Sequence, residues 1–255
     1  MGIRNMGKQI IIFAIPYESG RNYIYLCKSY KLEKLGKRLT KEMTFAMVVI
    51  DERVCQVILV QPGDNEEKQG ILTSWEKQKE KWKQIPSTIK VSLGRNGIIS
   101  AAEKKEGDGY TPDGVYDIKR AFGYNTFITK LPYIHLTQND YWVDDPASAN
   151  YNRLVRQCPA VESCEKMKRD DNLYKIGFVI EYNTESRVSG QGSAIFAHIW
   201  RSCNSPTLGC VAMSEKDLAE LLEWLNPLKN PVIIISQERM ESFPMTQARL
   251  VGHLE

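Results

Sequence analysis

Short apolar runs separated by turn residues dominate the chain from residue 54 to residue 118. Runs of this length, rich in β-branched residues and bounded by Gly, Pro, Asn and Asp, are typical of β-strands. The pattern predicts turns at Pro62–Asp64 and Gly94–Gly97. It indicates a meander of strands, which we place at Val54–Val60, Gly70–Glu76, Ile89–Leu93 and Val115–Ile118.

Three further strands are expected later in the chain, at Gly177–Tyr182, Ile195–Trp200 and Val232–Ile235. Residues alternate between the two faces of a strand, so Phe196, His198 and Trp200 share one face. The segment Glu162–Arg169 has the composition of a short helix. Tyr141–Asn152, with two adjacent acids and a proline, favours a long irregular loop of the kind that often lines a site.

One longer helix is predicted directly before the last strand. Ser214 and Asp217 form the S-x-x-D pattern of a helix start, and leucines follow at helical spacing at positions 218, 221, 222 and 225. The helix should end near Asn226–Pro227. The chain is therefore expected to be mostly β with minor α, a mixed β-sandwich with this helix packed against it.

The repeating pattern begins near residue 51, which divides the chain into three parts. We expect an extension of unknown role at residues 1–50, one main domain at residues 51–240 and a tail at residues 241–255. The whole chain of 255 residues is 42% hydrophobic and 25% charged, which suits an ordinary globular protein with a real core.

Charge and hydropathy exclude two classes of partner. A formal net charge of +3 with interleaved signs gives no basic field for nucleic acid. No run approaches the roughly 18 apolar residues of a membrane helix. The apolar stretch Ile10–Ile15 is too short for the core of a signal peptide, so no clear export signal is predicted.

Six cysteines are too few for a disulfide-built scaffold, although Cys158 and Cys164 could form a local disulfide in an exported protein.

The candidate chemistry lies between the histidine strand and the helix. Cys210 follows Gly209 in a predicted turn, and His198 lies twelve residues earlier. A helix start after the cysteine would favour a thiolate and a developing oxyanion. A cysteine and a histidine brought within reach of each other are the nucleophile and base that acyl transfer needs.

A metal site and a serine site are the competing interpretations. Zinc could in principle bind His198, Cys203 and Cys210, with Cys158 and Cys164 completing the site. However, no C-x2–4-C pair occurs and the spacings fit no common zinc pattern, so we predict no metal and no cofactor. A G-x-S-x-G elbow and a phosphate-binding glycine loop are also absent from the sequence.

Three motifs resemble the L,D-transpeptidase catalytic domains of the YkuD/ErfK type. Thr111–Tyr116 (TPDGVY) is similar to the family's T-P-x-G-x-[FY] strand entry. Ile195–Trp200 is similar to its histidine motif, and Thr207–Met213 (TLGCVAM) to its [ST]-H-G-C-[IV]-R-M signature. The likeness covers roughly Val54–Ser236, and it departs from the family at Leu208, where a histidine is usual, and at Ala212, where an arginine is usual.

The resemblance implies roles for these residues. Cys210 would be the nucleophile, His198 would take its proton, and the backbone of Gly209 and Cys210 would hold the oxyanion. In that family a backbone carbonyl orients the histidine. The remaining candidates for substrate binding are Thr207, Arg201, Trp142, Asp144 and Asp145.

The implied activity is peptidoglycan cross-linking through a cysteine acyl-enzyme, with stem peptides as donor and acceptor. Hydrolysis of the same intermediate would make the protein an L,D-carboxypeptidase. The changes at Leu208 and Ala212 leave open a third function, a non-catalytic wall-binding domain of the same fold. The resemblance implies a location in the cell envelope, the periplasm or outside the cell, although the lack of a clear signal peptide leaves a cytoplasmic location open.

Overall fold

The structure is a computed structural model that describes residues 23–26, 48–51, 53–63, 68–79, 81–157 and 160–239. The chain divides into two compact units, residues 1–53 with 241–255 and residues 54–240. In the first unit, β1 (Tyr23–Leu26) pairs antiparallel with β2 (Val48–Asp51). Most of the predicted extension and all of the predicted tail lie outside the described residues, and the domain boundaries stay predictions.

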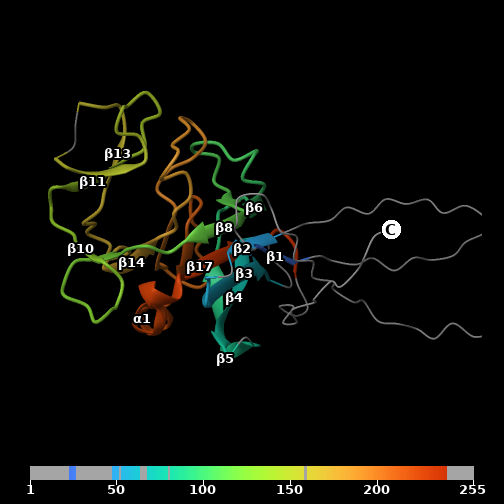
Figure 1. The fold of residues 1–255 in the computed structure, drawn as a ribbon. Helices are drawn as coiled ribbons and strands as arrows, with labels where there is room; N and C mark the ends of the chain where they lie inside the picture. The colour runs from blue at the N-terminus through green and yellow to red at the C-terminus, as the bar shows by residue number, and fades with distance from the viewer. Residues whose placement is uncertain are drawn as a thin grey trace, which may run out of the picture. The chain divides into compact units, whose positions relative to one another are not determined.

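Ten strands of the described part of the second unit form one mixed sheet (Figure 1). Strands β3 (Gln56–Pro62), β4 (Gln69–Gln78) and β5 (Lys81–Ser92) form an antiparallel meander as predicted, but the fourth predicted strand, β8 (Gly114–Asp117), pairs instead with β17 (Val232–Ile235). The pairs β15 with β16, β17 with β3 and β10 with β9 are parallel. Across the sheet, the order is β10 (Tyr133–His135), β9 (Ala121–Gly123), β14 (Ile176–Val179), β15 (Phe196–Ile199), β16 (Val211–Met213), β5 (Lys81–Ser92), β4 (Gln69–Gln78), β3 (Gln56–Pro62), β17 (Val232–Ile235) and β8 (Gly114–Asp117).

Two smaller sheets lie beside this one. The first has the order β12 (Arg153–Arg156), β11 (Asp140–Val143) and β13 (Cys164–Lys166), all antiparallel. The second is the parallel pair of β6 (Ile98–Ile99) and β7 (Thr111–Pro112). The mostly β fold with one helix after the cysteine strand is therefore confirmed.

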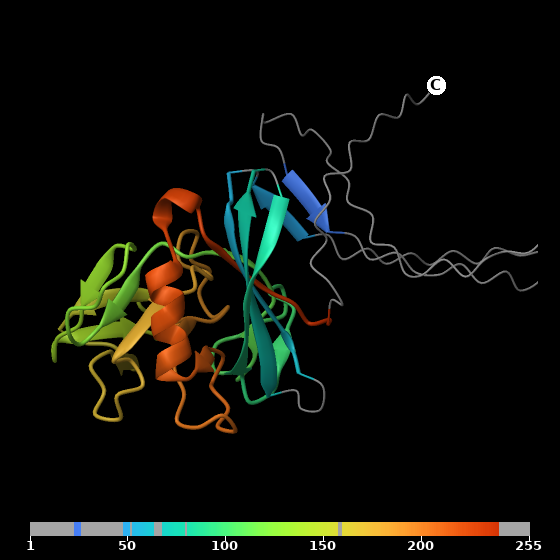
Figure 2. The ribbon, with the colours of Figure 1, turned by 90° about the horizontal axis from the view of Figure 1, so that it is seen from below.

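The predicted helix is α1 (Glu215–Trp224), and it begins where the sequence pattern placed it. Ser214 is the N-cap, because its Oγ accepts a hydrogen bond from the Asp217 amide at 3.1 Å. A 3₁₀ turn, η1 (Pro227–Lys229), follows. Figure 2 shows α1 in orange lying beside the sheet. Its leucines at 218, 221 and 222 are buried, and so is the C-cap residue Leu225.

The residues of β15 and β16 separate two hydrophobic clusters. Ala197 and Val211 pack into a large core with α1 and the β3–β5 meander. Phe196 and Cys210 face a smaller cluster that also holds Phe122, Trp142 and Tyr174. The predicted alternation of faces in the histidine strand is therefore present, and it directs the cysteine and the histidine away from the large core.

Two predicted elements are wrong. Glu162–Arg169 is not a helix, because Cys164–Lys166 forms strand β13 against β11. Pairing with a neighbouring strand overrides the helix propensity of Glu, Met, Lys and Arg in that segment. Tyr141–Asn152 is not an irregular loop throughout, because its first three residues belong to β11 and only the remainder forms turns.

Candidate active site

The cysteine and the histidine lie on adjacent parallel strands. In the register of β15 and β16, Ala197 pairs with Val211 and His198 with Ala212. Cys210 directly precedes β16, and its Sγ accepts a hydrogen bond from the Phe196 amide at 3.4 Å. Alternation along a strand then places Cys210 on the same face as Phe196 and His198. The topology thus brings together two side chains that are twelve residues apart.

The turn before Cys210 is tied to the strand that ends at Ser92. The Thr207 amide donates to Leu93 O at 2.8 Å, and Thr207 O accepts from the Arg95 amide at 2.9 Å. Within the turn, Thr207 Oγ1 donates to Cys210 O at 2.7 Å and accepts from the Gly209 amide at 3.1 Å. Thr207 therefore fixes the backbone on both sides of Gly209.

Only glycine suits position 209. Its φ is 139°, and a Cβ at this position would lie 2.8 Å from Tyr110 O. Thr111, the first residue of the TPDGVY motif, directly follows Tyr110. It is buried, and its Oγ1 accepts a hydrogen bond from the Gly94 amide. The two family motifs thus lie against each other in the fold. Because the Gly209 amide bonds to Thr207, the Cys210 amide is the better candidate donor for an oxyanion.

The Cys210 thiol is buried and protonated at rest. The residue is 8% exposed, and its Sγ donates to Ala194 O at 3.2 Å. Burial, reinforced by the nearby Glu165 carboxylate, raises the pKa of the thiol to about 12. Burial in the resting site therefore opposes the expected thiolate, whose formation stays a prediction. Strand β16 separates Cys210 from the start of α1 at Glu215, so the helix terminus does not directly follow the cysteine.

His198 is held as a neutral base. Its Nδ1 bonds to Ile199 O at 2.8 Å, and because a carbonyl only accepts, Nδ1 carries the proton and Nε2 presents a lone pair. Burial lowers the pKa of His198 to about 4. No hydrogen bond joins His198 to Cys210 among the described residues. The resting pair is thus a thiol and a neutral imidazole on one face of the sheet.

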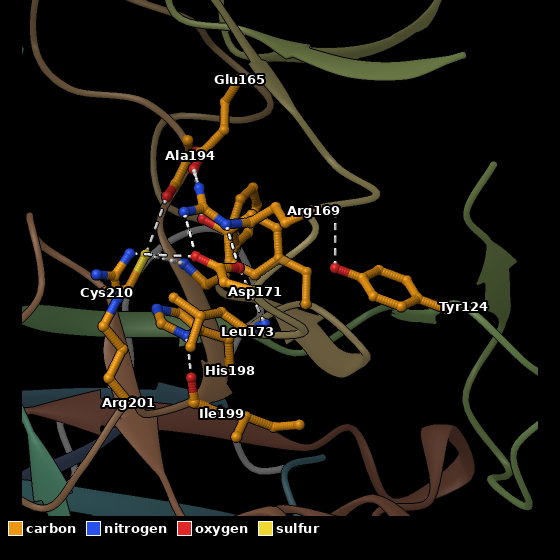
Figure 3. Close-up of polar contacts among 12 residues, drawn as sticks. Tyr124, Glu165, Arg169, Asp171, Leu173, Ala194, His198, Ile199, Arg201 and Cys210 are labelled. Carbon is orange, nitrogen blue, oxygen red and sulfur yellow. Dashed lines mark hydrogen bonds and ion pairs between the residues drawn. The ribbon is translucent and has the colours of Figure 1, made fainter. Parts of the chain in front are cut away.

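A polar network that sequence reasoning missed lies beside this pair (Figure 3). Tyr174 places its ring edge-on to the His198 imidazole, with the centroids 5.2 Å apart. The Tyr174 hydroxyl donates to Glu165 Oε1 at 2.8 Å, and Arg169 Nη1 donates to the same oxygen at 3.0 Å. Asp171 accepts two hydrogen bonds from Arg169, which lower the pKa of its carboxyl to about 2. Charged residues at positions 165 to 171 were visible in the sequence, but such runs are usually solvated surface.

The predicted substrate-binding residues are distributed over several positions. Arg201 is 65% exposed at its side chain and bonds Asp171 at 3.2 Å. Trp142 is buried against Phe196 and donates from Nε1 to Asn152 Oδ1 at 2.7 Å. Asp145 accepts the amides of Ala147 and Glu162 and so shapes its own loop. Asp144 has a buried Oδ1 without a hydrogen-bond partner among the described residues. Contact of any of these residues with a substrate stays a prediction.

The two departures from the family signature have different surroundings. Leu208 is 72% exposed in the turn Thr207–Cys210, which we call the nucleophile turn after its candidate nucleophile. Ala212 is instead buried in β16 beside His198. Position 212 is buried, so an arginine there would place its side chain inside the site. The alanine leaves that interior without the guanidinium group. Leu208 instead changes the exposed surface of the turn.

The described ranges hold neither a cluster of metal-binding side chains nor a helix suited to a membrane. No group of three or more His, Cys, Asp and Glu side chains gathers there as metal ligands would. Cys203 is exposed and free, Cys164 is disulfide-bonded, and Cys158 lies outside the described residues. Within the same ranges, no helix has the length and apolar character needed to cross a membrane.

The comparisons identify the family. The model of the YkuD L,D-transpeptidase catalytic domain matches residues 63–234. The chain belongs to this family. A solved structure, the helical cell shape determining protein Pgp2 from Campylobacter jejuni, aligns at 17% identity and a TM-score of 0.39. That alignment covers 76% of this chain and 50% of the Pgp2 chain. The comparison with curated proteins gave no match.

Proposed function

We propose that the chain is a cysteine acyltransferase that acts on peptidoglycan stem peptides as an L,D-transpeptidase. The observation that carries the proposal is the neutral His198, fixed through Nδ1 by Ile199 O, on the same sheet face as Cys210. A base in this tautomer can accept a proton only at Nε2. The matching family model supports the substrate class.

Acylation begins from an uncharged pair. Cys210 Sγ leaves its hydrogen bond to Ala194 O and transfers its proton to His198 Nε2 as sulfur attacks the carbonyl carbon of an L-residue. The Cys210 amide donates to the oxyanion. Collapse breaks the C–N bond, and the imidazolium returns its proton to the departing D-residue amine. The product is a thioester on Cys210 and neutral His198.

Deacylation reverses these roles. An acceptor amine loses a proton to His198 Nε2 as it attacks the thioester, and the Cys210 thiolate that leaves takes this proton back. Water in place of the amine gives the L,D-carboxypeptidase reaction at the same site. The acceptor alone separates the two outcomes, so product analysis with and without an amine acceptor distinguishes them.

Intact-mass measurement tests the proposal. Incubation with a stem tetrapeptide should add one acyl group to the wild-type protein and none to Cys210→Ala. Cys203→Ala is the matched control, because Cys203 is free and exposed, and it should acylate like wild type. A wild-type mass that does not change with a verified substrate contradicts the proposal and favours a wall-binding domain without turnover.

We further place the protein at the cell envelope, where its substrate lies. The support is the family alone. Cell fractionation followed by immunodetection should find the chain with the envelope. Recovery in the cytoplasmic fraction only would contradict this location.

A further inference from the structure

His198 needs more than one contact to aim Nε2 at the nucleophile. Its hydrogen bond from Nδ1 to Ile199 O fixes the tautomer, but Ile199 is the next residue in the same strand. That hydrogen bond alone does not fix the plane of the ring, so packing against the neighbouring side chains has to fix it. The only other ring contact described for the imidazole is the edge-on ring of Tyr174, at an interplanar angle of 76°.

Four side chains besides His198 contact Tyr174 and fix its position. Its ring packs edge-on against Phe122 and Phe196, with centroids 5.9 Å and 5.6 Å away. The Arg169 guanidinium lies over the same ring, 5.2 Å from its centroid. Its hydroxyl bonds to Glu165 Oε1 at 2.8 Å. The ring is almost fully buried, so its position is set by these contacts.

Arg169 joins the two carboxylates of the network, and Arg201 also bonds Asp171 at 3.2 Å. Arg169 donates to Glu165 at 3.0 Å and to both oxygens of Asp171, at 2.9 Å and 2.7 Å. Paired, two-pronged contacts of this kind give orientation as well as energy. The Asp171 carboxylate also accepts the Leu173 amide at 3.3 Å, which ties the turn before Tyr174 to Arg169.

We propose that Tyr174 is a positioning residue that holds the His198 imidazole toward Cys210, and that Glu165 and Arg169 hold Tyr174 in turn. The effect on turnover rests on the proposed acyl transfer. The effect on the imidazole does not, because it concerns the free protein. The two parts can therefore fail separately.

Imidazole NMR of the full-length chain tests the structural part without a substrate. The chain has only three histidines, so ¹⁵N-histidine spectra resolve His198 after comparison with His198→Gln. In wild type, His198 should show one Nδ1–H tautomer. Tyr174→Leu should give averaged nitrogen shifts or a mixed tautomer, whereas Tyr174→Phe, which keeps the ring, should stay close to wild type.

Leu136→Ala is the matched control. Leu136 belongs to the same cluster and is fully buried, but no contact with His198, Tyr174 or Arg169 is described for it. It should leave the His198 signals unchanged. Equal disturbance of His198 by Leu136→Ala and Tyr174→Leu would overturn the proposal, because general loosening of the cluster would then explain both. An undisturbed His198 in folded Tyr174→Leu would overturn it as well.

Kinetics test the catalytic part. With a stem tetrapeptide, Tyr174→Leu should lower kcat by roughly 100-fold, as expected for a misplaced catalytic group, and change KM by less than about twofold. Glu165→Gln should show a smaller loss of kcat. Loss confined to KM would assign Tyr174 to substrate binding and overturn the positioning role. If wild type has no activity while the NMR result holds, the proposed function fails and the positioning of His198 stands.

Discussion

Cys210 and His198 are both more than nine-tenths buried, and burial opposes charge on each side chain. The site therefore rests as a neutral pair, not as a thiolate with an imidazolium. Under the proposed function, such a site would form the thiolate only as a substrate carbonyl receives the electron pair. The resting hydrogen bond from Sγ to Ala194 O is the interaction that an incoming substrate must replace.

The first prediction concerns thiol reactivity. Because the pKa of Cys210 is raised to about 12, its thiolate is scarce at neutral pH, and alkylation by iodoacetamide should be slower than for a free thiol. The rate should rise about tenfold per pH unit between pH 7 and 10. Exposed Cys203 serves as the internal reference and should react first in peptide mapping. Faster labelling of Cys210 than of Cys203 at pH 7 would contradict the neutral pair.

The second prediction concerns stability in acid. The pKa of His198 falls from 6.5 in an ordinary setting to about 4 in the folded protein. As pH falls from 6.5 to 4, His198 becomes protonated in the unfolded chain but stays neutral in the folded chain. The free energy of unfolding therefore decreases. The full effect is roughly 3 kcal/mol. Urea unfolding of wild type and of His198→Gln measures it, and parallel pH curves would contradict it.

At the scale of the elements, the nucleophile turn depends on a backbone conformation that glycine alone adopts without strain. Gly209→Ala should lower the free energy of unfolding by about 1–3 kcal/mol and disturb Cys210, since a Cβ would lie 2.8 Å from Tyr110 O. Gly190→Ala is the matched control. Its φ is also positive, at 76°, but its Cβ would meet nothing within 4 Å. Chemical denaturation of both variants checks the difference, and equal losses would show that the contact with Tyr110 is unimportant.

A second element-scale prediction follows from the helix cap. Ser214→Ala removes the acceptor for the Asp217 amide and should cost about 1 kcal/mol of unfolding free energy. Ser186→Ala, at an exposed loop position, should cost almost nothing. A Ser214→Ala variant as stable as Ser186→Ala would show that the cap is not needed once α1 is packed.

The local sequence pattern predicted those elements whose formation depends on nearby residues alone. The α1 start is fixed by Ser214 and Asp217, and β17 lies at Val232–Ile235 as predicted. Strand β13 was missed because its formation depends on β11, which is more than twenty residues away. The Glu165–Arg169–Tyr174 network was missed for the same reason. Its residues become significant only once β14 and β15 bring them beside His198.

At the scale of the whole molecule, residues 54–240 contain both hydrophobic clusters and every element of the site. We expect this segment expressed alone to unfold in one cooperative transition and to keep the His198 signals of the full chain. Calorimetry and ¹⁵N-histidine spectra provide the measurement. Aggregation or loss of the His198 signals would show that the first unit contributes to the site.

Backbone hydrogen bonds anchor both ends of the connection between β15 and β16. The Trp200 amide donates to Met213 O, and the Thr207 amide donates to Leu93 O. Of the residues between these anchors, Arg201 bonds Asp171, whereas no hydrogen bond described for residues 202–206 reaches His198 or Cys210. The strand register therefore sets the distance in space between His198 and Cys210, whatever the number of residues in the connecting loop. A search pattern for such a site needs to fix the two strands and not the number of residues between histidine and cysteine. For the engineer, the same loop is an insertion point for an affinity tag or a fluorophore that leaves the site in register.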